Sequence, residues 1–575
     1  MDKRFFLALL LTGAVVLATP LIFQRPPAPP PASVPAAPVE GAGTTGSPTP
    51  APPTVAPALD VPRQALAATP PPAAAVAAES LTLGNDLTTF TFSTLGATFL
   101  GAELPRFRRL RNGEGAVRLA HGGEPMLRYR LIAGGDTVAL DRLPFRATRS
   151  VTARGEQLRF AGALGVATVE VRYTLTADNY LAAVEIQATG LPQPVFLLTD
   201  LPTGFTSQEA DSTEDARHLA YAMKPQGAGA ERVDFRKPDP GERILKPGPM
   251  TWVFAKSKYF LIGVLTPESA LAPFAEVHVV GAPRVNKMAV RASATVVSPL
   301  PESGVAFELY AGPQEWERLV AMGRELQNVN PYGGWISGVV QPFATIVMRI
   351  LLWMKRTLNV EYGWILVLFG VLVRLLMWPL NSRMMRSQMA MQRLAPEIQA
   401  AQNKHKGDPE AQRAAVMKVY SDAGVSPFAA VSGCLPMLLP MPILIALFFV
   451  FQNTIEFRGV SFLWLADISL KDPHYILPLA MGASMYALSW VGMRNVPPNP
   501  QTKMMAVLMP VILTVALLNF ASGLNLYYTV QNLAALPQQW LIANERAKAA
   551  KPPAKPSAKP ATAAAASGGG AKKKR

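Results

Sequence analysis

A single charged residue, Arg374, lies inside an apolar run that extends from residue 362 to residue 380. An ionised group at membrane depth costs about 3 kcal/mol or more unless it meets water, a partner or the lipid headgroups. Gly370 and Asn381 share its helical face and mark a small, polar stripe. One interpretation is that the side chain extends to the headgroups, because Arg383 follows shortly after it. The other is that Arg374 faces a hydrated cavity.

The apolar runs of the chain offer this arginine no partner of opposite charge. They contain no Asp, Glu, Lys or His. A permanent ion pair and a carboxylate proton relay are therefore excluded within these segments. What remains is a water-filled cavity that receives a negative charge from another molecule. The predicted spans cover residues 362–380, 431–451, 475–493, 504–520 and 524–541.

The last of these runs carries polar side chains along one helical face. Such a stripe is typical of hydrogen bonding between neighbouring helices. A polar stripe of this kind would also suit the wall of a hydrated groove opposite Arg374. The sequence leaves both interpretations open. The residues of the stripe are Asn525, Tyr528, Thr529, Asn532 and Gln539.

Residues 381–424 predict a helical hairpin between the first two spans. Asp408 is placed to cap the second helix of the hairpin, and Pro409 is suited to its first turn. Methionine adapts to varied apolar partners, which suits a surface that receives hydrophobic segments. Packing within the hairpin explains these methionines equally well. They include Met384, Met385, Met389 and Met391.

The composition is typical of a membrane protein with more than one domain. Half of the 575 residues are hydrophobic, 16% are charged and the mean hydropathy is positive. The single cysteine, Cys434, excludes an internal disulfide framework and a thiolate metal cluster. We expect neither a metal nor a cofactor.

Before the spans, alternation of apolar and polar residues predicts an antiparallel β sandwich. The clearest strands are residues 88–92, 127–131 and 169–175. No Ser/His/Asp or metal-ligand grouping stands out there, so we assign this region no catalysis and predict that the chain is not an enzyme.

These patterns predict a polytopic α-helical membrane protein with six transmembrane helices, five of which form a core. The first helix follows Lys3 and Arg4 and is interpreted as an uncleaved anchor rather than a cleaved signal peptide. An amphipathic stretch, 335–355, suits the membrane surface. The predicted domains are a signal-anchor helix (1–24), a Pro/Ala-rich disordered linker (25–78), a β-sandwich domain (79–325), a helical core (326–545) and a basic disordered tail (546–575).

Basic residues set the predicted orientation. They are concentrated in the hairpin and in the tail, whereas the loop 452–474 holds few. Both termini are therefore expected in the cytoplasm and the β domain outside it. The tail would bind either anionic lipids or ribosomal RNA, and the sequence does not choose between them.

Several segments, in this order, resemble the YidC family of membrane protein insertases. The resemblance covers about residues 330–546, and residues 258–260 and 310–313 look like pieces of the family's periplasmic β-supersandwich. It implies an inner-membrane protein with a five-helix insertase core and a groove open to the cytoplasm and lipid. In this groove Arg374 and Tyr528 would contact substrate. The matching segments are 373–380, 433–436, 441–443, 472–478 and 522–528.

The predicted function is therefore that of an insertase and chaperone for nascent membrane proteins, acting alone or with the Sec translocon. The hairpin would capture a nascent segment, and Arg374 would draw its hydrophilic tail into the groove. A solute transporter predicts inverted repeats, which the sequence does not show. A membrane-anchored hydrolase needs a nucleophile and base at membrane depth, and a nucleotide-driven pump needs a phosphate-binding loop. The sequence offers neither.

Overall fold

The computed structural model describes residues 78–111, 113, 115–153, 155–268, 273–330, 337–405, 407–423, 441–494 and 500–550. All of them belong to one compact unit, Ala58–Arg575. The predicted anchor helix, almost all of the linker, Cys434 and most of the basic tail lie outside the described residues.

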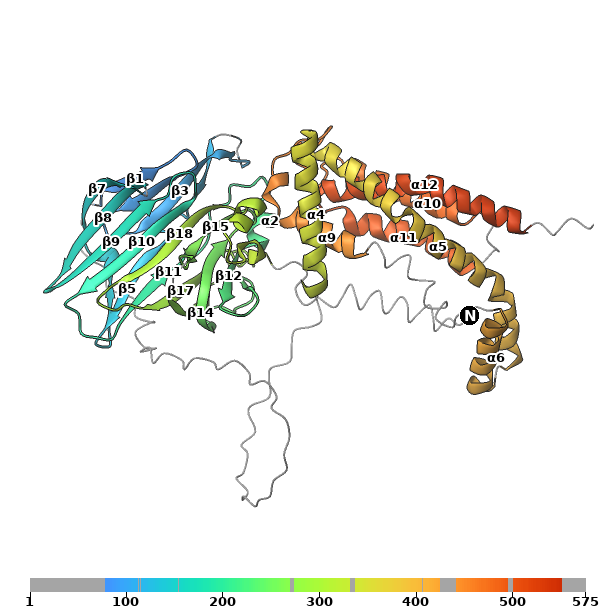
Figure 1. Cartoon of the computed structure of the whole chain (residues 1–575), viewed down its shortest axis with the longest axis horizontal. Coiled ribbons are helices and arrows are strands. Elements are labelled where there is room, and N and C mark those ends of the chain that lie inside the picture. The colour runs from blue at the N-terminus through green and yellow to red at the C-terminus, as the bar shows by residue number, and fades with distance from the viewer. Residues whose placement is uncertain are drawn as a thin grey trace, which may run out of the picture. The chain divides into compact units, whose positions relative to one another are not determined.

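The region after the linker is built from antiparallel strands in two sheets (Figure 1). The smaller has the order β1-β2-β3-β4, and the larger has 14 strands. The three strands expected from sequence alternation are confirmed as β2, β5 and β9. The strands are β1 Ser80–Gly84, β2 Thr89–Ser93, β3 Phe99–Arg108, β4 Ala116–Leu119, β5 Arg128–Ala133, β6 Asp136–Ala139, β7 Arg146–Thr152, β8 Gly155–Leu164, β9 Ala167–Leu175, β10 Leu181–Thr189, β11 Val195–Asp200, β12 Ala220–Pro225, β13 Glu231–Asp234, β14 Arg243–Lys256, β15 Phe260–Leu265, β16 Phe274–Gly281, β17 Ala292–Pro299 and β18 Val305–Pro313.

The large sheet folds back on itself through its longest strand. The first half of β14 pairs with β16, and its second half pairs with β12 and β15. Tyr173 on β9 donates a hydrogen bond to the hydroxyl of Tyr129 on β5 over 2.9 Å, although these strands lie in different halves of the sheet. Phe92 of the small sheet packs on Tyr173 with ring centroids 4.3 Å apart. The halves and the small sheet therefore enclose one apolar core, as in a sandwich.

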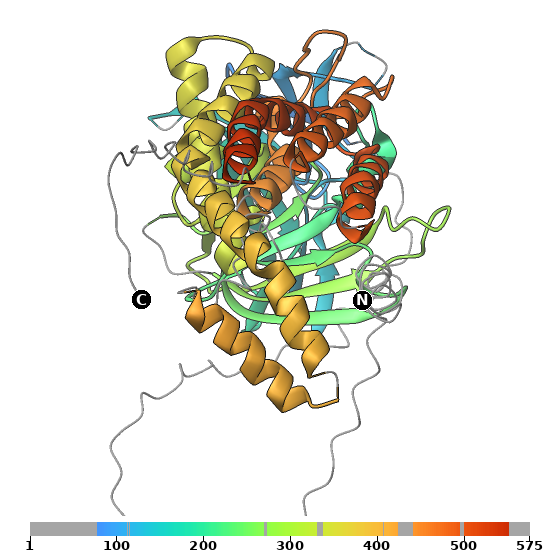
Figure 2. The same cartoon turned by 90° about the vertical axis from the view of Figure 1, so that its right-hand side faces the viewer.

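The rest of the described chain is helical. α4 begins within a few residues of the predicted amphipathic stretch, and Asp408 caps α6 by accepting from the backbone N–H groups of Glu410 and Ala411. The hairpin's first helix is not separate, because α5 runs without a break from the predicted span into the hairpin (Figure 2). The helices are α2 Ser212–Arg217, α3 Trp316–Ala321, α4 Ser337–Leu358, α5 Tyr362–Lys404, α6 Pro409–Asp422, α9 Met441–Asn453, α10 Ile476–Gly492, α11 Pro500–Leu517 and α12 Ser522–Ala550.

One stretch of the described helices, Tyr362–Arg386 in α5, is long and apolar enough to cross a membrane. Much of its surface has no protein cover, since Leu376 is 71% exposed and Leu375 is 60% exposed. Three further apolar helices are shorter, namely Ile443–Asn453, Ile476–Gly492 and Lys503–Leu517. The described residues therefore do not reproduce the predicted count of six spans.

The loop between α9 and α10 contacts the β domain through polar groups. Arg458 donates from Nε to both carboxylate oxygens of Glu209, at 2.9 and 2.8 Å. The hydroxyl of Tyr259 donates to Ser469 over 3.0 Å. The backbone N–H of Trp316 donates to Oε1 of Glu456 over 3.1 Å. This set of contacts, here called the junction, fixes the loop to the sandwich.

Glu456 is expected to make the stability of the junction depend on pH. Burial raises the pKa of its carboxyl from 4.5 to about 7, and its Oε2 has no hydrogen-bond partner among the described residues. The folded state thus holds the proton more tightly than the unfolded state. This stabilisation is full at low pH and is lost as pH rises from about 4.5 to about 7.

We therefore expect Glu456→Gln to stabilise the protein by roughly 2 kcal/mol at pH 8 and to change little at pH 4.5. Thermal unfolding in detergent, followed by tryptophan fluorescence at both pH values, measures this difference. The same change in melting temperature at both pH values would contradict the assignment.

Candidate functional site

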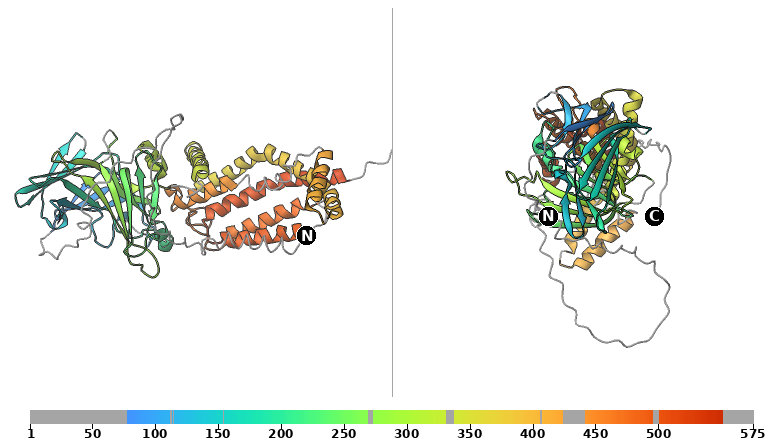
Figure 3. Two further views of the ribbon diagram at one scale, coloured as in Figure 1. Left: turned by 90° about the horizontal axis from the view of Figure 1, so that it is seen from below. Right: turned by 90° about the vertical axis from the view of Figure 1, so that its left-hand side faces the viewer.

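Arg374 lies on α5 where this helix packs against α12. α12 also packs along α10 and touches α9 (Figure 3). Close approach to α5 is possible because Gly370 has no side chain. A Cβ there would lie 3.0 Å from Cγ1 of Val530 on α12. Gly370 is thus a packing position in this structure, one turn from the arginine.

The guanidinium of Arg374 is held by a neutral side chain. Its Nη2 donates to Oε1 of Gln538 on α12 over 2.7 Å. The amide nitrogen of Gln538 donates in turn to the carbonyl of Trp378 over 2.8 Å and to Oγ of Ser382 over 2.7 Å. Gln538 is almost fully buried and therefore fixes the depth of the guanidinium along α5.

The charge of Arg374 is not neutralised by this contact. None of the ion pairs among the described residues includes Arg374, and its Nε is buried without a hydrogen-bond partner. Arg374 is therefore a half-buried cation whose charge has no counter-charge and whose Nε has no acceptor among the described residues. Asn381 is also half-buried on this helix.

Most of the predicted polar stripe on α12 makes contacts away from Arg374. Asn525 is fully buried and donates to the carbonyl of Leu517 over 3.2 Å. Asn532 donates to Oγ of Ser484 on α10 over 3.2 Å.

Two further stripe residues also have partners on α12 or α10. Thr529 donates to the carbonyl of Asn525 over 2.8 Å. Gln539 lies against Gly492 of α10, where a Cβ would meet its amide nitrogen at 2.4 Å. Tyr528 is half-buried, with its ring centroid 6.4 Å from that of Tyr527. Asn525, Thr529 and Asn532 thus supply hydrogen bonds within α12 and to neighbouring helices, and a role of the stripe as a groove wall stays a prediction.

A second polar face of α12, missed from the sequence, turns toward α5. Gln531 donates to the hydroxyl of Tyr527 over 2.7 Å, and Gln538 follows at helical spacing with its bond to Arg374. Further on, Glu545 pairs with Arg386 over 3.0 Å. The signal was present in the sequence, because Tyr527, Gln531 and Gln538 repeat at intervals of four and seven residues.

The hairpin methionines are only partly described. Met384 and Met385 are half-buried on α5. The backbone of Met389 and Met391 is helical, and their side chains lie outside the described residues. Whether these methionines contact substrate stays a prediction.

We expect Gln538→Ala to slow the insertion activity predicted from the sequence, because the Arg374 guanidinium loses the side chain that orients it. The variant removes the acceptor that holds Arg374 and leaves a buried guanidinium group unpaired, so we expect about tenfold slower insertion in the assay given below. Gln539→Ala is the matched control, because Gln539 lies against α10. Equal losses in the two variants would show that the effect is one of helix packing and not of arginine position.

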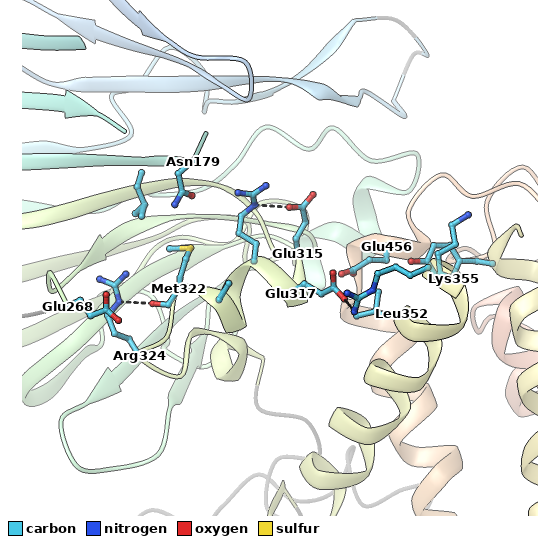
Figure 4. Close-up of a pocket in the computed structure, with 14 residues that line it drawn as sticks. Asn179, Glu268, Glu315, Glu317, Met322, Arg324, Leu352, Lys355 and Glu456 are labelled. Atoms are coloured by element: carbon cyan, nitrogen blue, oxygen red, sulfur yellow. Dashed lines mark hydrogen bonds and ion pairs between the residues drawn. The ribbon is translucent and has the colours of Figure 1, made fainter. Parts of the chain in front are cut away.

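Other hollows of the molecule do not lie at Arg374. A cavity of about 780 Å³ lies among α3, α4, the β domain and the α9–α10 loop (Figure 4). Its charges are largely used internally, as Arg318 binds Glu315 over 2.9 Å. No group of three or more His, Cys, Asp or Glu that could hold a metal is present among the residues that the structure describes.

The fold and the site together define a class of protein that has a β-sandwich domain, a helical core with one stretch long and apolar enough to cross a membrane, and a cationic site between core helices. The family described as "60Kd inner membrane protein" matches residues 353–550, and "YidC periplasmic domain" matches residues 80–346. The chain belongs to the YidC family.

Relatives agree over most of the chain. The membrane protein insertase YidC of Anaeromyxobacter sp. (strain Fw109-5) is 31% identical over 74% of this chain and 74% of its own. That of Anaeromyxobacter dehalogenans (strain 2CP-1) is 30% identical over 83% of this chain and 87% of its own. A crystal structure of an active YidC insertase with its first transmembrane domain resolved is 19% identical, covers 80% of this chain and 92% of its own, and has a TM-score of 0.32.

Proposed function

We propose that this protein is an inner-membrane insertase that moves hydrophilic tails of nascent membrane proteins across the bilayer and releases their hydrophobic segments into lipid. The observation that carries the proposal is the state of Arg374, which is held by the neutral Gln538 and keeps an unused buried donor. Because Gln538 is neutral, the positive charge of Arg374 remains available to attract an incoming chain. Membership in a family whose relatives carry the name insertase gives the substrate class.

In this proposal the groove beside α5 is hydrated and opens to the cytoplasm. The hairpin of α5 and α6 receives the nascent segment, with its methionines adapting to different apolar surfaces. Arg374 then attracts the acidic or polar tail. The hydrophobic segment leaves sideways past the exposed face of α5, where Leu375 and Leu376 already face outward.

Two driving forces suffice without nucleotide. Transfer of the segment into lipid buries apolar surface, which contributes about 25 cal/mol per Å². The membrane potential adds about 2.3 kcal/mol per charge per 100 mV for an acidic tail that moves outward. The protein itself lowers the free-energy barrier for the hydrophilic tail to cross the bilayer.

The proposed orientation places both termini in the cytoplasm and the β domain in the periplasm. The proposed domain limits are those expected from the sequence. The proposed partners are the Sec translocon for larger substrates, and ribosomes or anionic lipids at the basic tail, where the closing Lys572–Arg575 segment carries four charges.

Reconstitution tests the function directly. Purified protein in liposomes is supplied with a ribosome-free single-span substrate that carries an acidic tail, and protease protection of the tail is measured. We expect insertion well above that of protein-free liposomes, and we expect it to increase with a membrane potential that is negative on the hairpin side, from which the substrate is supplied. Insertion no greater than in protein-free liposomes would refute the function.

A further inference from the structure

A larger cavity lies between the β domain and the ends of the core helices. Its volume is about 1170 Å³. One wall comes from the sandwich, around α2 and β13. The opposite wall contains the aromatic side chains Phe448 and Phe449 near the end of α9 and Phe520 after α11. The cavity thus has a charged wall on the sandwich side. On the core side the three aromatic side chains lie among polar residues, namely Gln452, Asn453, Ser469, Lys471 and Asn519.

The carboxylates that line this cavity are already satisfied. Asp211 caps α2 by accepting from the N–H groups of Thr213 and Glu214. The carboxylate of Glu214 binds Arg217 over 3.1 Å and the ring of His218 over 3.2 Å.

Asp234 binds Arg232 over 3.0 Å. These contacts also neutralise Arg217 and Arg232. Of the remaining lining charges, Arg236, Lys258 and Lys471 are positive, and Asp211, which accepts only from backbone N–H groups, is negative.

Three lining cations have no carboxylate partner among the described residues, namely Arg236, Lys258 and Lys471. Lys258 is the most informative, because it is only 3% exposed. Its ammonium group lies 5.2 Å from the ring centroid of Tyr259, and no hydrogen-bond acceptor for it is found in the described part of the chain. An ammonium group without a carboxylate partner at the lining is available to an anion that enters the cavity.

The surroundings of Lys258 carry charges of both signs. Its charge acts on the pKa values of the carboxyl groups of Glu209 and Glu214, and its backbone N–H donates to Oδ1 of Asp215 over 3.1 Å. Lys256 is fully buried, and its Nζ has no hydrogen-bond partner among the described residues. Burial lowers the pKa of His218, and the charges of Lys256 and Lys258 lower it further. Both lysines therefore act on the same small region of the wall.

The cavity of Figure 4 provides an internal comparison. There Arg356 binds Glu317 over 2.5 Å and Arg324 binds Glu308 over 2.6 Å. Lys355 donates to the carbonyl of Val360 over 3.0 Å. Its cations are satisfied by the protein, whereas Arg236, Lys258 and Lys471 of the larger cavity have no carboxylate partner among the described residues.

We propose that the larger cavity binds the headgroup of an anionic phospholipid, with its phosphate against Lys258, Arg236 and Lys471. The acyl chains would leave along the aromatic wall of Phe448, Phe449 and Phe520. Because α9 and α11 both end at this cavity, it lies at headgroup level if these helices span the membrane. In the orientation proposed above, the lipid comes from the outer leaflet.

A lipid fits the observations better than a free phosphate ion. Inorganic phosphate would use the three cations and leave the aromatic wall in contact with water. A phospholipid uses both walls, since about 0.8 kcal/mol is gained per buried CH₂ group. The inference rests on the proposed membrane topology and does not depend on insertion activity.

Native mass spectrometry of the full-length protein in detergent tests the proposal, with phosphatidylglycerol as the probe and phosphatidylcholine and inorganic phosphate as comparisons. We expect retention of phosphatidylglycerol in preference to both. We expect Lys258→Gln to weaken it about tenfold, the effect of one lost charge-assisted hydrogen bond, and Arg236→Gln and Lys471→Gln to weaken it less. Lys237→Gln is the matched control, because this exposed lysine neighbours Arg236 outside the lining.

The outcomes are separable. If Lys258→Gln fails to fold, the exposed Arg236→Gln and Lys471→Gln variants decide the matter. Unchanged retention in both, or an equal loss in Lys237→Gln, would overturn the site. Equal binding of inorganic phosphate would overturn the lipid assignment. A wild-type protein that binds phosphatidylglycerol but inserts no substrate would refute the proposed function and leave this site standing.

Discussion

Arg374→Ala should reduce insertion of a substrate with an acidic tail at least tenfold in the liposome assay. The substitution removes the one charge of the predicted spans and the donor that Gln538 now accepts. A charge-assisted hydrogen bond contributes roughly 1.5–3 kcal/mol, which corresponds to about 10- to 100-fold in rate if it is made in the rate-limiting step. Insertion of the same substrate with a neutral tail should fall much less.

Two further variants separate charge from structure. Arg374→Lys should keep activity within about threefold, because the proposed groove needs no bidentate fork and an ammonium group can still donate to Gln538. Arg383→Ala is the matched control, since Arg383 is an exposed arginine on the same helix. If Arg374→Ala slows acidic and neutral tails equally, the arginine serves folding or packing and not substrate attraction.

The second large effect is expected at the junction. Arg458 and Glu209 form a pair whose side chains are only 4% and 8% exposed. Arg458 also donates to the carbonyl of Arg108 over 2.9 Å and lies 5.4 Å from the ring centroid of Phe260. Burial raises the pKa of Glu209 and the charge of Arg458 opposes that shift, so loss of the arginine leaves an unpaired buried carboxyl.

Arg458→Met should therefore destabilise the protein by about 3–5 kcal/mol, which lowers the melting temperature by roughly 10 °C. Adding Glu209→Leu should restore most of this loss, because an apolar pair leaves no orphan charge. Thermal unfolding measures the loss of stability and its recovery, and the rate of trypsin cleavage at the junction provides a second measurement. As a control, Arg356→Ala breaks a pair whose side chains are 70% and 46% exposed and should cost less than about 1 kcal/mol. Comparable losses in the two single variants would contradict the role of burial.

Local patterns in the sequence were sufficient for much of the fold. Alternation located β2, β5 and β9, and the Asp408–Pro409 pair located the start of α6. These features depend on neighbours in the chain, where side-chain period and capping chemistry decide the outcome. The internal pairing of the 14-stranded sheet could not be predicted, because β5 and β9 meet only through long-range contacts.

Of the candidate site, the sequence predicted Arg374 but not its partner Gln538, because local patterns do not show which helices pack together. Arg374 is conspicuous because its neighbours are apolar, whereas Gln538 is one of several polar residues on α12. Which face of α12 meets α5 depends on the packing of α10 on its other side, where Asn532 finds Ser484. Sequence periodicity groups residues on a face but does not say which helix that face contacts.

The predicted span and the first helix of the predicted hairpin form one continuous helix, and this has a mechanical consequence. α5 is one helix of 43 residues, so the distance from Arg374 to Lys404 is about 45 Å at 1.5 Å per residue. A tilt of a few degrees at the hairpin end is carried along this rod as a shift in the depth and direction of the guanidinium. The rod contains Pro379 and Pro396, the positions where such a helix bends. If the hairpin captures a chain as proposed, its movement and the position of the Arg374 guanidinium are coupled through one helix, in which Pro379 is the proline nearest to Arg374.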